Sequence, residues 1–370
     1  MRWQRIESDT ALLDALGEVA GSTVVAVDTE FMRRNTFYPQ VALLQLCFGE
    51  KALLVDPLAI ADTAPLVALL SDPGVVKALH SASEDLEVFS RWLGVLPEPL
   101  FDTQRAAALL DMGFGMGYSA LVKRVCDVDL PKGETTSDWL RRPLSDSQCE
   151  YAAQDVAWLL PVWRHLEDLC QQQDKHDWVL ADGRDAITAY LSPGIDYLKK
   201  FKSAWKLNPR QLAVLTAVCA WREQTARQRN KPRGWIIDDQ ACMQLALFDP
   251  QTAQELKAQV GLDDSTMRRH AGELLELLAV QRQLGEGDLP QRLPAPLDAA
   301  QRNQLKKLKE RVRIMARELS TAPEALLQSR DYELLLREAG GEAVERPGHW
   351  QGWRLDRVIE PLRASMARVA

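Results

Sequence analysis

The 370 residues, 46% hydrophobic and 26% charged, are typical of a globular protein with two or three domains, and no apolar run is long enough to cross a bilayer. The six cysteines form no Cys-x-x-Cys pair, and no histidine stands at zinc-finger spacing, which argues against a structural zinc site. The net charge of −7 is uneven, because residues 1–200 carry 18 Lys+Arg against 30 Asp+Glu and residues 201–370 carry 27 against 22; a basic half that binds a polyanion and ordinary scatter of surface charge both explain this.

The first 200 residues predict an α/β domain. The N-terminus has acidic and polar side chains where a signal peptide has an apolar stretch, so we expect a cytoplasmic protein whose chain starts with a helix near residues 9–19. Apolar, partly β-branched segments predict three strands that are antiparallel neighbours because their connections are short. Two more strands and a helix follow, and helices continue to about residue 190. The strands are predicted at 23–27, 41–48, 52–55, 75–79 and near Leu100, and the later helix at 84–93. The order predicts a mixed sheet flanked by helices.

The remainder of the chain predicts helices only. The pattern breaks around Ser192-Pro193-Gly194, and Asn208-Pro209 is a suitable N-cap followed by proline at the first helical position. A stretch rich in glycine and proline, residues 284–296, is typical of a linker between two helical units of similar length. The similar lengths leave an internal duplication open.

Two acidic residues end the first strand. Asp28 and Glu30 are two positions apart, so their side chains point to the same side of a strand. Converging carboxylates repel each other unless a cation lies between them, and hard ions such as Mg²⁺ prefer such ligands. Taken alone, the pair is also typical of a solvated strand end.

A tyrosine and an aspartate share one face of a later helix. Tyr151 and Asp155 are four residues apart, and a phenol beside a metal-bound carboxylate can hold a water molecule that the metal activates. In isolation, core packing of the tyrosine and capping or surface pairing of the aspartate are the favoured explanation of these two residues. Asp85 is a further candidate at a helix start, where acidic residues also favour the helix dipole.

In combination these features resemble the tyrosine subgroup of the DEDD exonuclease superfamily, and within it the ribonuclease D family of bacteria. The motifs that carry the resemblance are Val-Asp-Thr-Glu-Phe at 27–31, Leu-Leu-Gln-Leu at 43–46, His80 to Asp85, Phe-Asp-Thr at 101–103, Ser-Asp-Trp at 137–139, Arg-Pro-Leu at 142–144 and Tyr151 to Asp155. The resemblance implies a ribonuclease H-like exonuclease domain at 1–195, a helical HRDC domain of the kind found in RecQ helicases at 207–288, and a second, divergent HRDC-like domain at 298–370.

The resemblance also implies an activity. A DEDD exonuclease holds two divalent metal ions, Mg²⁺ or Mn²⁺, and shortens a nucleic acid from its 3′ end with release of nucleoside 5′-monophosphates. Here the metal ligands are expected to be Asp28, Glu30, Asp85 and Asp155, with Tyr151 orienting the attacking water. The expected substrates are RNA 3′ ends, above all tRNA precursors and other small stable RNAs, and the expected state is a monomer.

Four residues are candidates for substrate contacts, each with a structural alternative: Gln45, His80, Lys132 and Trp139. Trp139 either stacks on a terminal base or packs in the core, and Lys132 either reaches a phosphate or is solvated. A basic stretch in the helical half is suited to a phosphate backbone, or is a solvated helix face: Arg222, Arg227, Arg229, Lys231, Arg233 and Trp235. A DNA 3′→5′ exonuclease and a catalytically inactive RNA-binding scaffold remain alternative functions.

Overall fold

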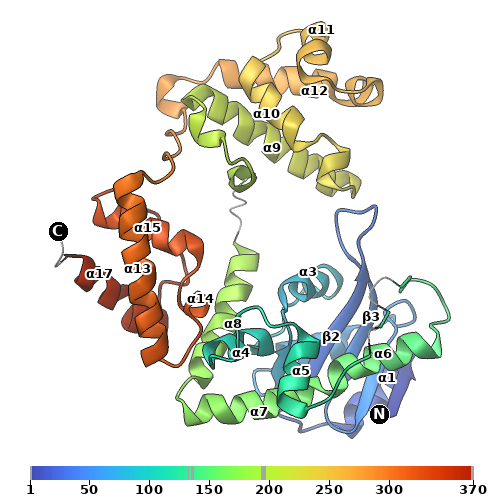
Figure 1. Cartoon of the computed structure of the whole chain (residues 1–370). Coiled ribbons are helices and arrows are strands. Elements are labelled where there is room, and N and C mark those ends of the chain that lie inside the picture. Colours follow the sequence, from blue (N-terminus) through green and yellow to red (C-terminus); the bar gives the residue numbers. More distant parts are fainter. Residues whose placement is uncertain (1, 132, 135–136, 193–196, 368–370) are drawn as a thin grey trace. The chain divides into compact units, whose positions relative to one another are not determined.

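The computed structural model describes residues 2–131, 133–134, 137–192 and 197–367. They form two compact units. The first unit comprises Met1–Met32, Pro39–Ser192 and Leu297–Ala370, and the second comprises Arg33–Tyr38 and Pro193–Pro296. Figure 1 shows the elements of each unit. In the described ranges no helix is both long and apolar enough for a membrane span.

A six-stranded mixed sheet is the centre of the first unit. Its spatial order is β1-β4-β3-β2-β5-β6. The pairs β2–β3 and β3–β4 are antiparallel, which confirms the expectation from the short connections, and β1–β4, β2–β5 and β5–β6 are parallel. The strands are β1 (Arg2–Ile6), β2 (Val24–Met32), β3 (Gln40–Cys47), β4 (Lys51–Val55), β5 (Val76–Leu79) and β6 (Leu100–Asp102).

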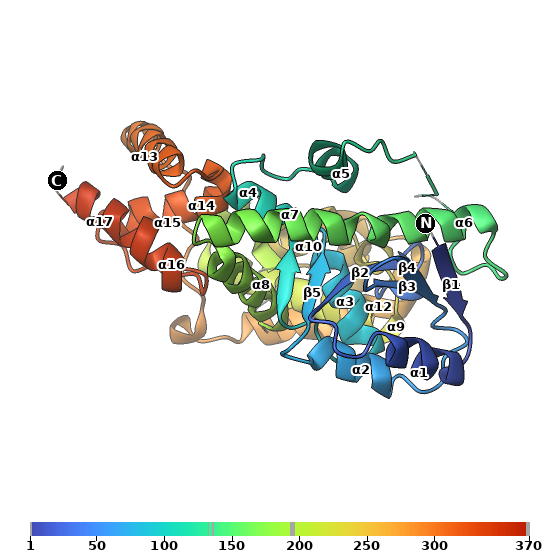
Figure 2. The same cartoon turned by 90° about the horizontal axis from the view of Figure 1, so that it is seen from below.

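Helices cover both faces of the sheet. Figure 2 shows α1, α2 and α3 on one side and α6 and α7 on the other. One apolar core contains Val25 and Val27 of β2 together with side chains of α1, α2 and α3. A second core contains Val24 and Ala26 of the same strand together with side chains of α6. The helices are α1 (Asp9–Glu18), α2 (Ala64–Ser71), α3 (Ser83–Trp92), α4 (Thr103–Leu109), α5 (Tyr118–Cys126), α6 (Asp146–Ala157), α7 (Leu159–Gln172) and α8 (His176–Leu191).

A β-bulge interrupts the pairing of β2 with β3. Glu30 lies opposite Leu43 and Phe31 opposite Val41, so Ala42 has no partner in the ladder. Its carbonyl accepts a hydrogen bond of 2.7 Å from Nη2 of Arg142 instead. Arg142 also pairs with both carboxylate oxygens of Asp56 and donates to two backbone carbonyls through Nη1. Every N–H of this guanidinium is therefore used, and it ties the bulge to the segment that leads into α6.

The last helical segment packs on the α/β part of the first unit, residues 2–32 and 39–192. The amide of Ala322 donates to the carbonyl of Ala108 at 2.8 Å, and the buried Nζ of Lys175 donates to the carbonyls of Leu109 and Ser320. The rings of Trp178 and Trp353 stack with centroids 4.3 Å apart. The segment consists of α13 (Ala299–Glu318), α14 (Pro323–Leu326), α15 (Ser329–Ala339), α16 (Gly352–Arg354), a π-helical turn (Leu355–Ile359) and α17 (Glu360–Ala367).

The second unit is a helical bundle around its own apolar core. Asn208 caps its first long helix as predicted, in a capping box with Gln211, and Pro209 occupies the first position. The predicted break at Pro193-Gly194 lies outside the described residues. The helices are α9 (Pro209–Arg229), α10 (Asp239–Phe248), α11 (Ala253–Glu255), a π-helical turn (Leu256–Val260) and α12 (Asp264–Arg282).

The two helical segments share an unusual local feature. In each, a three-residue helix continues directly into a five-residue π-helical turn, at residues 253–260 in one and 352–359 in the other. Single π-helical turns are rare. Because a long helix and a helix of 10 or 11 residues precede this turn in both segments, the shared order supports the suggested duplication.

Candidate active site

Strand β2 aims two carboxylates at α6. Val25 and Val27 belong to the core under α1–α3, whereas Val24 and Ala26 belong to the core under α6. Since side chains alternate along a strand, the carboxylates two and four positions after Ala26 emerge on the α6 side. These are Asp28 and Glu30, and both are partly buried.

Helix α6 supplies the tyrosine and the third carboxylate. Its start is fixed by a capping box in which Ser145 and Gln148 bond to each other's backbone amides. Ala152 and Ala153 are fully buried, so small side chains let the helix lie close on the sheet. The spacing of four residues then places Tyr151 and Asp155 together on one helix face, as the sequence predicts.

Helix α3 supplies the fourth carboxylate. Asp85 lies in its first turn and is 7% exposed. The hydroxyl of Thr29, between Asp28 and Glu30 in β2, donates a hydrogen bond of 2.5 Å to Oδ1 of Asp85. This contact fixes the start of α3 against the end of the strand.

The four carboxylates are close enough to repel one another. Burial, followed by the charge of Asp155, raises the pKa of Asp28, and burial, followed by the charge of Asp28, raises that of Asp85. The pKa of Glu30 is raised to about 9, by burial and then by the charges of Asp28, Asp155 and Asp85. Burial raises the pKa of Asp155 to about 7, although contact with Tyr151 opposes the shift. Strand, helix and helix thus concentrate negative charge at one place.

This donor set fits divalent cations. Within the described residues, no lysine or arginine forms an ion pair with any of the four carboxylates. Oxygen ligands without a protein counter-charge are what Mg²⁺ and Mn²⁺ prefer. In those same ranges no group of three such side chains is already arranged to hold a metal ion.

A cavity of about 320 Å³ opens beside Tyr151 and Asp155. Its wall includes Gly133, which approaches the tyrosine ring so closely that a Cβ at this position would lie 1.9 Å from Cδ2 of Tyr151. Burial and then the charge of Asp155 raise the pKa of Tyr151, so the phenol keeps its proton at neutral pH. The cavity therefore has a hydroxyl donor and a carboxylate side by side.

Two residues near the carboxylates were not identified from the sequence. Thr29 lies within the Val-Asp-Thr-Glu-Phe motif. Alternation along β2 places it on the side opposite Asp28, and this is the signal that its side chain contacts a different element, α3. Tyr118 lies near Asp28 and Asp155, whose charges add to burial in raising its pKa, and its hydroxyl donates to the carbonyl of Gln154. No local pattern marks Tyr118, because tertiary packing of α5 brings it there.

The four candidate substrate contacts fare differently in the structure. Trp139 is 1% exposed and packs 6.0 Å from the ring of Tyr151, so its burial argues against base stacking. Gln45 is fully buried opposite Asp28 and contacts no solvent. Both ring nitrogens of His80 are used, by Thr103 and by the carbonyl of Met116. In the structure these three side chains are thus buried or already hydrogen-bonded, and Lys132 lies outside the described residues.

The predicted basic stretch of the second unit is largely neutralised within that unit. Arg222 is 5% exposed and pairs with Asp239 at 2.7 Å, while Arg227 and Arg233 both pair with the buried Glu223. Carboxylates therefore already pair with three of its five cations, which leaves fewer of them available to a phosphate backbone.

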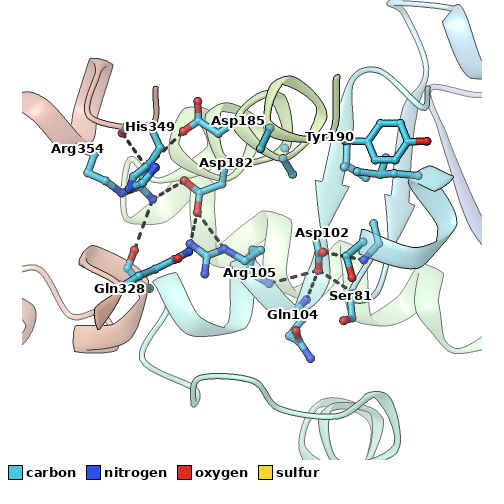
Figure 3. A pocket seen from close by; sticks show the side chains of 18 of the residues that line it. Ser81, Asp102, Gln104, Arg105, Asp182, Asp185, Tyr190, Gln328, His349 and Arg354 are labelled. Carbon is cyan, nitrogen blue, oxygen red and sulfur yellow. Dashed lines mark hydrogen bonds and ion pairs between the residues drawn. The ribbon is translucent and has the colours of Figure 1, made fainter. Parts of the chain in front are cut away.

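A larger cavity, of about 570 Å³, lies between the α/β part of the first unit and the last helical segment (Figure 3). Asp182 is its central charge and accepts hydrogen bonds from Arg105 and Arg354, the latter at 2.7 Å. Asp102 lines it too and accepts from the amides of Ser81 and Gln104. Since these charged groups already have partners, the cavity is a structural junction.

The mixed sheet, the four neighbouring carboxylates and the adjacent tyrosine form the arrangement expected of a 3′-5′ exonuclease of the DEDD type. Residues 3–171 match the family model of the 3′-5′ exonuclease, and residues 211–278 match that of the HRDC domain. Ribonuclease D of Pseudomonas paraeruginosa is 41% identical over 362 residues, which cover 97% of this chain and 96% of that protein. The chain belongs to the ribonuclease D family.

Solved structures agree with this assignment. The crystal structure of Escherichia coli RNase D superposes with a TM-score of 0.91 at 34% identity, covering 100% of this chain and 99% of that one. Its description is an exoribonuclease involved in structured RNA processing. The predicted fold, an α/β exonuclease domain followed by helical HRDC architecture, is confirmed, whereas the domain bounds from the sequence stay predictions.

Proposed function

We propose that this protein hydrolyses RNA from the 3′ end and releases nucleoside 5′-monophosphates with the help of two divalent metal ions. The observation that supports this most directly is the cluster of Asp28, Glu30, Asp85 and Asp155, whose pKa values are raised and which has no cationic partner among the described residues. Membership of the ribonuclease D family supports RNA as the polymer.

Each residue has a proposed role. The charge of Asp155 acts on Asp28, and that of Asp28 acts on Asp85, so Asp28 would be central to holding the ions. Glu30 and Asp155 would help hold the ion that activates the water, and Asp85, held by Thr29, would help hold the ion that stabilises the leaving group. When bound, the two ions supply an activated water and neutralise the leaving 3′-oxygen.

Tyr151 positions the attacking water. Its raised pKa keeps the hydroxyl protonated, so it can donate a hydrogen bond to the water or to a phosphate oxygen. The cavity of about 320 Å³ beside it is within the range of pockets that hold small ligands and suits one terminal nucleotide.

The proposed substrates are tRNA precursors with extra 3′ residues and other small stable RNAs, and the proposed state is a cytoplasmic monomer. Support comes from the relative in Escherichia coli, which is described as acting on structured RNA. The same metal site would also cleave DNA, so polymer choice needs a direct comparison.

The decisive experiment incubates the purified protein with 3′-extended tRNA or matched single-stranded DNA, in Mg²⁺, Mn²⁺ or EDTA. We expect stepwise RNA shortening that requires metal, with DNA left intact. Asp28→Asn should lower RNA cleavage at least about a thousandfold, since several kcal/mol of charge stabilisation is lost, and RNA binding should persist. Equal cleavage of DNA would favour a DNA exonuclease, and inert wild-type protein would favour a binding scaffold.

A further inference from the structure

Helix α13 is strongly basic in a chain that is acidic as a whole. Over Ala299–Glu318 it carries seven lysines and arginines but only two acidic residues, against a net charge of −7 for the chain. All seven cationic side chains are exposed. The helix therefore presents a concentrated positive charge to solvent.

Five of these cations follow one edge of the helix. They recur every three or four residues, a spacing that places side chains above one another on successive turns. The apolar side of α13, with Leu308 and Val312 buried, packs against α14 and α15. The edge residues, called the α13 stripe below, are Arg302, Lys306, Lys309, Arg313 and Arg317.

The α13 stripe has little internal compensation. Glu310 pairs with Arg313 at 3.0 Å and with Arg317 at 3.7 Å. Lys309 lies 5.7 Å from the ring centroid of Tyr332. In the part of the chain that the structure describes, no carboxylate pairs with Arg302 or Lys306. In the basic stretch of the second unit, by comparison, Asp239 and the buried Glu223 take three of the five cations.

Such an arrangement is unfavourable for the isolated helix. Like charges three or four residues apart destabilise a helix, and the stripe contains such a pair at each of its four steps. An exposed position does not require charge for packing, because the apolar face alone joins α13 to its neighbours. A polyanionic ligand would turn this repulsion into attraction.

We propose that the α13 stripe binds the phosphate backbone of the RNA substrate, upstream of the 3′ end that is cleaved. This proposal rests on the proposed function. RNA suits the stripe better than a membrane surface, because a membrane-binding helix needs a free apolar face and that of α13 is buried against the protein. The contact is electrostatic and independent of base sequence.

The test is the triple variant Lys306→Gln, Lys309→Gln, Arg313→Gln. Binding to a 3′-extended tRNA should become less dependent on salt. The slope of log K against log salt should fall in magnitude by about 2, because each phosphate contact contributes about 0.7–0.9. The KM for this RNA should rise at least about tenfold. The kcat on an oligoribonucleotide of a few residues should stay unchanged, because the proposal places α13 on RNA upstream of the residues that such a short substrate contains.

A control removes the same charge from the exonuclease part through Arg2→Gln, Lys51→Gln and Arg184→Gln. Arg2 and Lys51 are paired with Glu50 and Glu18. An unchanged salt slope in the triple variant, or an equal loss in the control, would overturn the proposal, as would loss of binding to anionic vesicles with RNA binding intact. If the wild-type protein does not hydrolyse the short oligoribonucleotide, that result would instead contradict the proposed function.

Discussion

At the scale of single residues, Gly133 limits how the site can change. A Cβ there would lie 1.9 Å from Cδ2 and 2.3 Å from Cε2 of Tyr151, so Gly133→Ala should push the phenol away from Asp155. A misplacement of about 1 Å can cost about a hundredfold in rate, and we expect kcat to fall at least about tenfold with little change in thermal stability. Gly49→Ala is the control, because nothing lies within 4 Å of a Cβ at that position. Equal activity of both variants would contradict the role of Gly133.

The carboxylate cluster predicts a pH dependence of the metal-free protein. The pKa of Glu30 is about 9 and that of Asp155 about 7, both above about 4 in an unfolded chain. Ionisation therefore costs folding free energy at high pH, and this cost disappears as the pH falls towards about 4. Urea unfolding in EDTA should show a smaller gain in stability on acidification for Glu30→Gln than for the wild type, and Mg²⁺ should stabilise the wild type most at high pH. Identical pH profiles for the two proteins would argue against the cluster.

The sequence predicted which side chains share a face better than it predicted which side chains are buried. Strand and helix periodicities predicted that Asp28 and Glu30 share a face, and likewise Tyr151 and Asp155, whereas only the family resemblance brought these pairs and Asp85 into one site. The alternatives for Gln45 and Trp139 stayed open in the sequence because side-chain type does not reveal burial; both are buried, and Trp139 packs in the core under α6. The metal-binding roles of Asp28, Glu30, Asp85 and Asp155 are proposals that a measurement of bound ions tests.

At the scale of elements, Asp102 joins two helix starts. Its carboxylate caps α4 through the amide of Gln104 and also accepts from the amides of Ser81 and Ala82, just before α3. Ser81 has a φ of 61°, so this bond holds an otherwise unfavourable backbone. The orientation of α3, and with it Asp85, thus depends on a residue of a neighbouring strand end.

Asp102→Ala should therefore affect both stability and metal binding. We expect a loss of about 1–2 kcal/mol in the free energy of unfolding, as for other N-caps, together with weaker Mn²⁺ binding measured by calorimetry. Asp263→Ala is the control, since Asp263 caps α12 by accepting from Thr266 and belongs to the second unit, whereas the four carboxylates belong to the first. Similar Mn²⁺ affinity in the two variants would show that Asp102 has no positioning role.

The elements themselves were largely predictable. Short connections indicated antiparallel neighbours, and β2, β3 and β4 pair in that way. Strand β1 escaped prediction because Arg2–Ile6 is mostly polar and lies at the edge of the sheet, where pairing by backbone requires no apolar pattern.

At the scale of the whole molecule, the last helical segment contributes to the stability of the exonuclease part. Trp353→Ala removes the ring stacked on Trp178 and should lower the unfolding free energy of the first unit by about 2–3 kcal/mol. Urea unfolding monitored by hydrogen exchange should show the loss in α4 and α8 but not in α9 and α10. Uniform destabilisation of both units, or none, would contradict this assignment. No periodicity in the sequence predicted which part this segment would join, because that depends on contacts between residues some 200 positions apart, such as Ala108 and Ala322.

The saturated guanidinium of Arg142 has a consequence for divergence within the family. Because its five donors anchor the approach to α6 on the bulge at Ala42 and on Asp56, the start of α6 is fixed from the sheet and not through the connection from α5. Insertions and deletions in that connection that spare Gly133 are therefore compatible with the same placement of α6, whereas lysine at position 142 cannot replace the forked contacts.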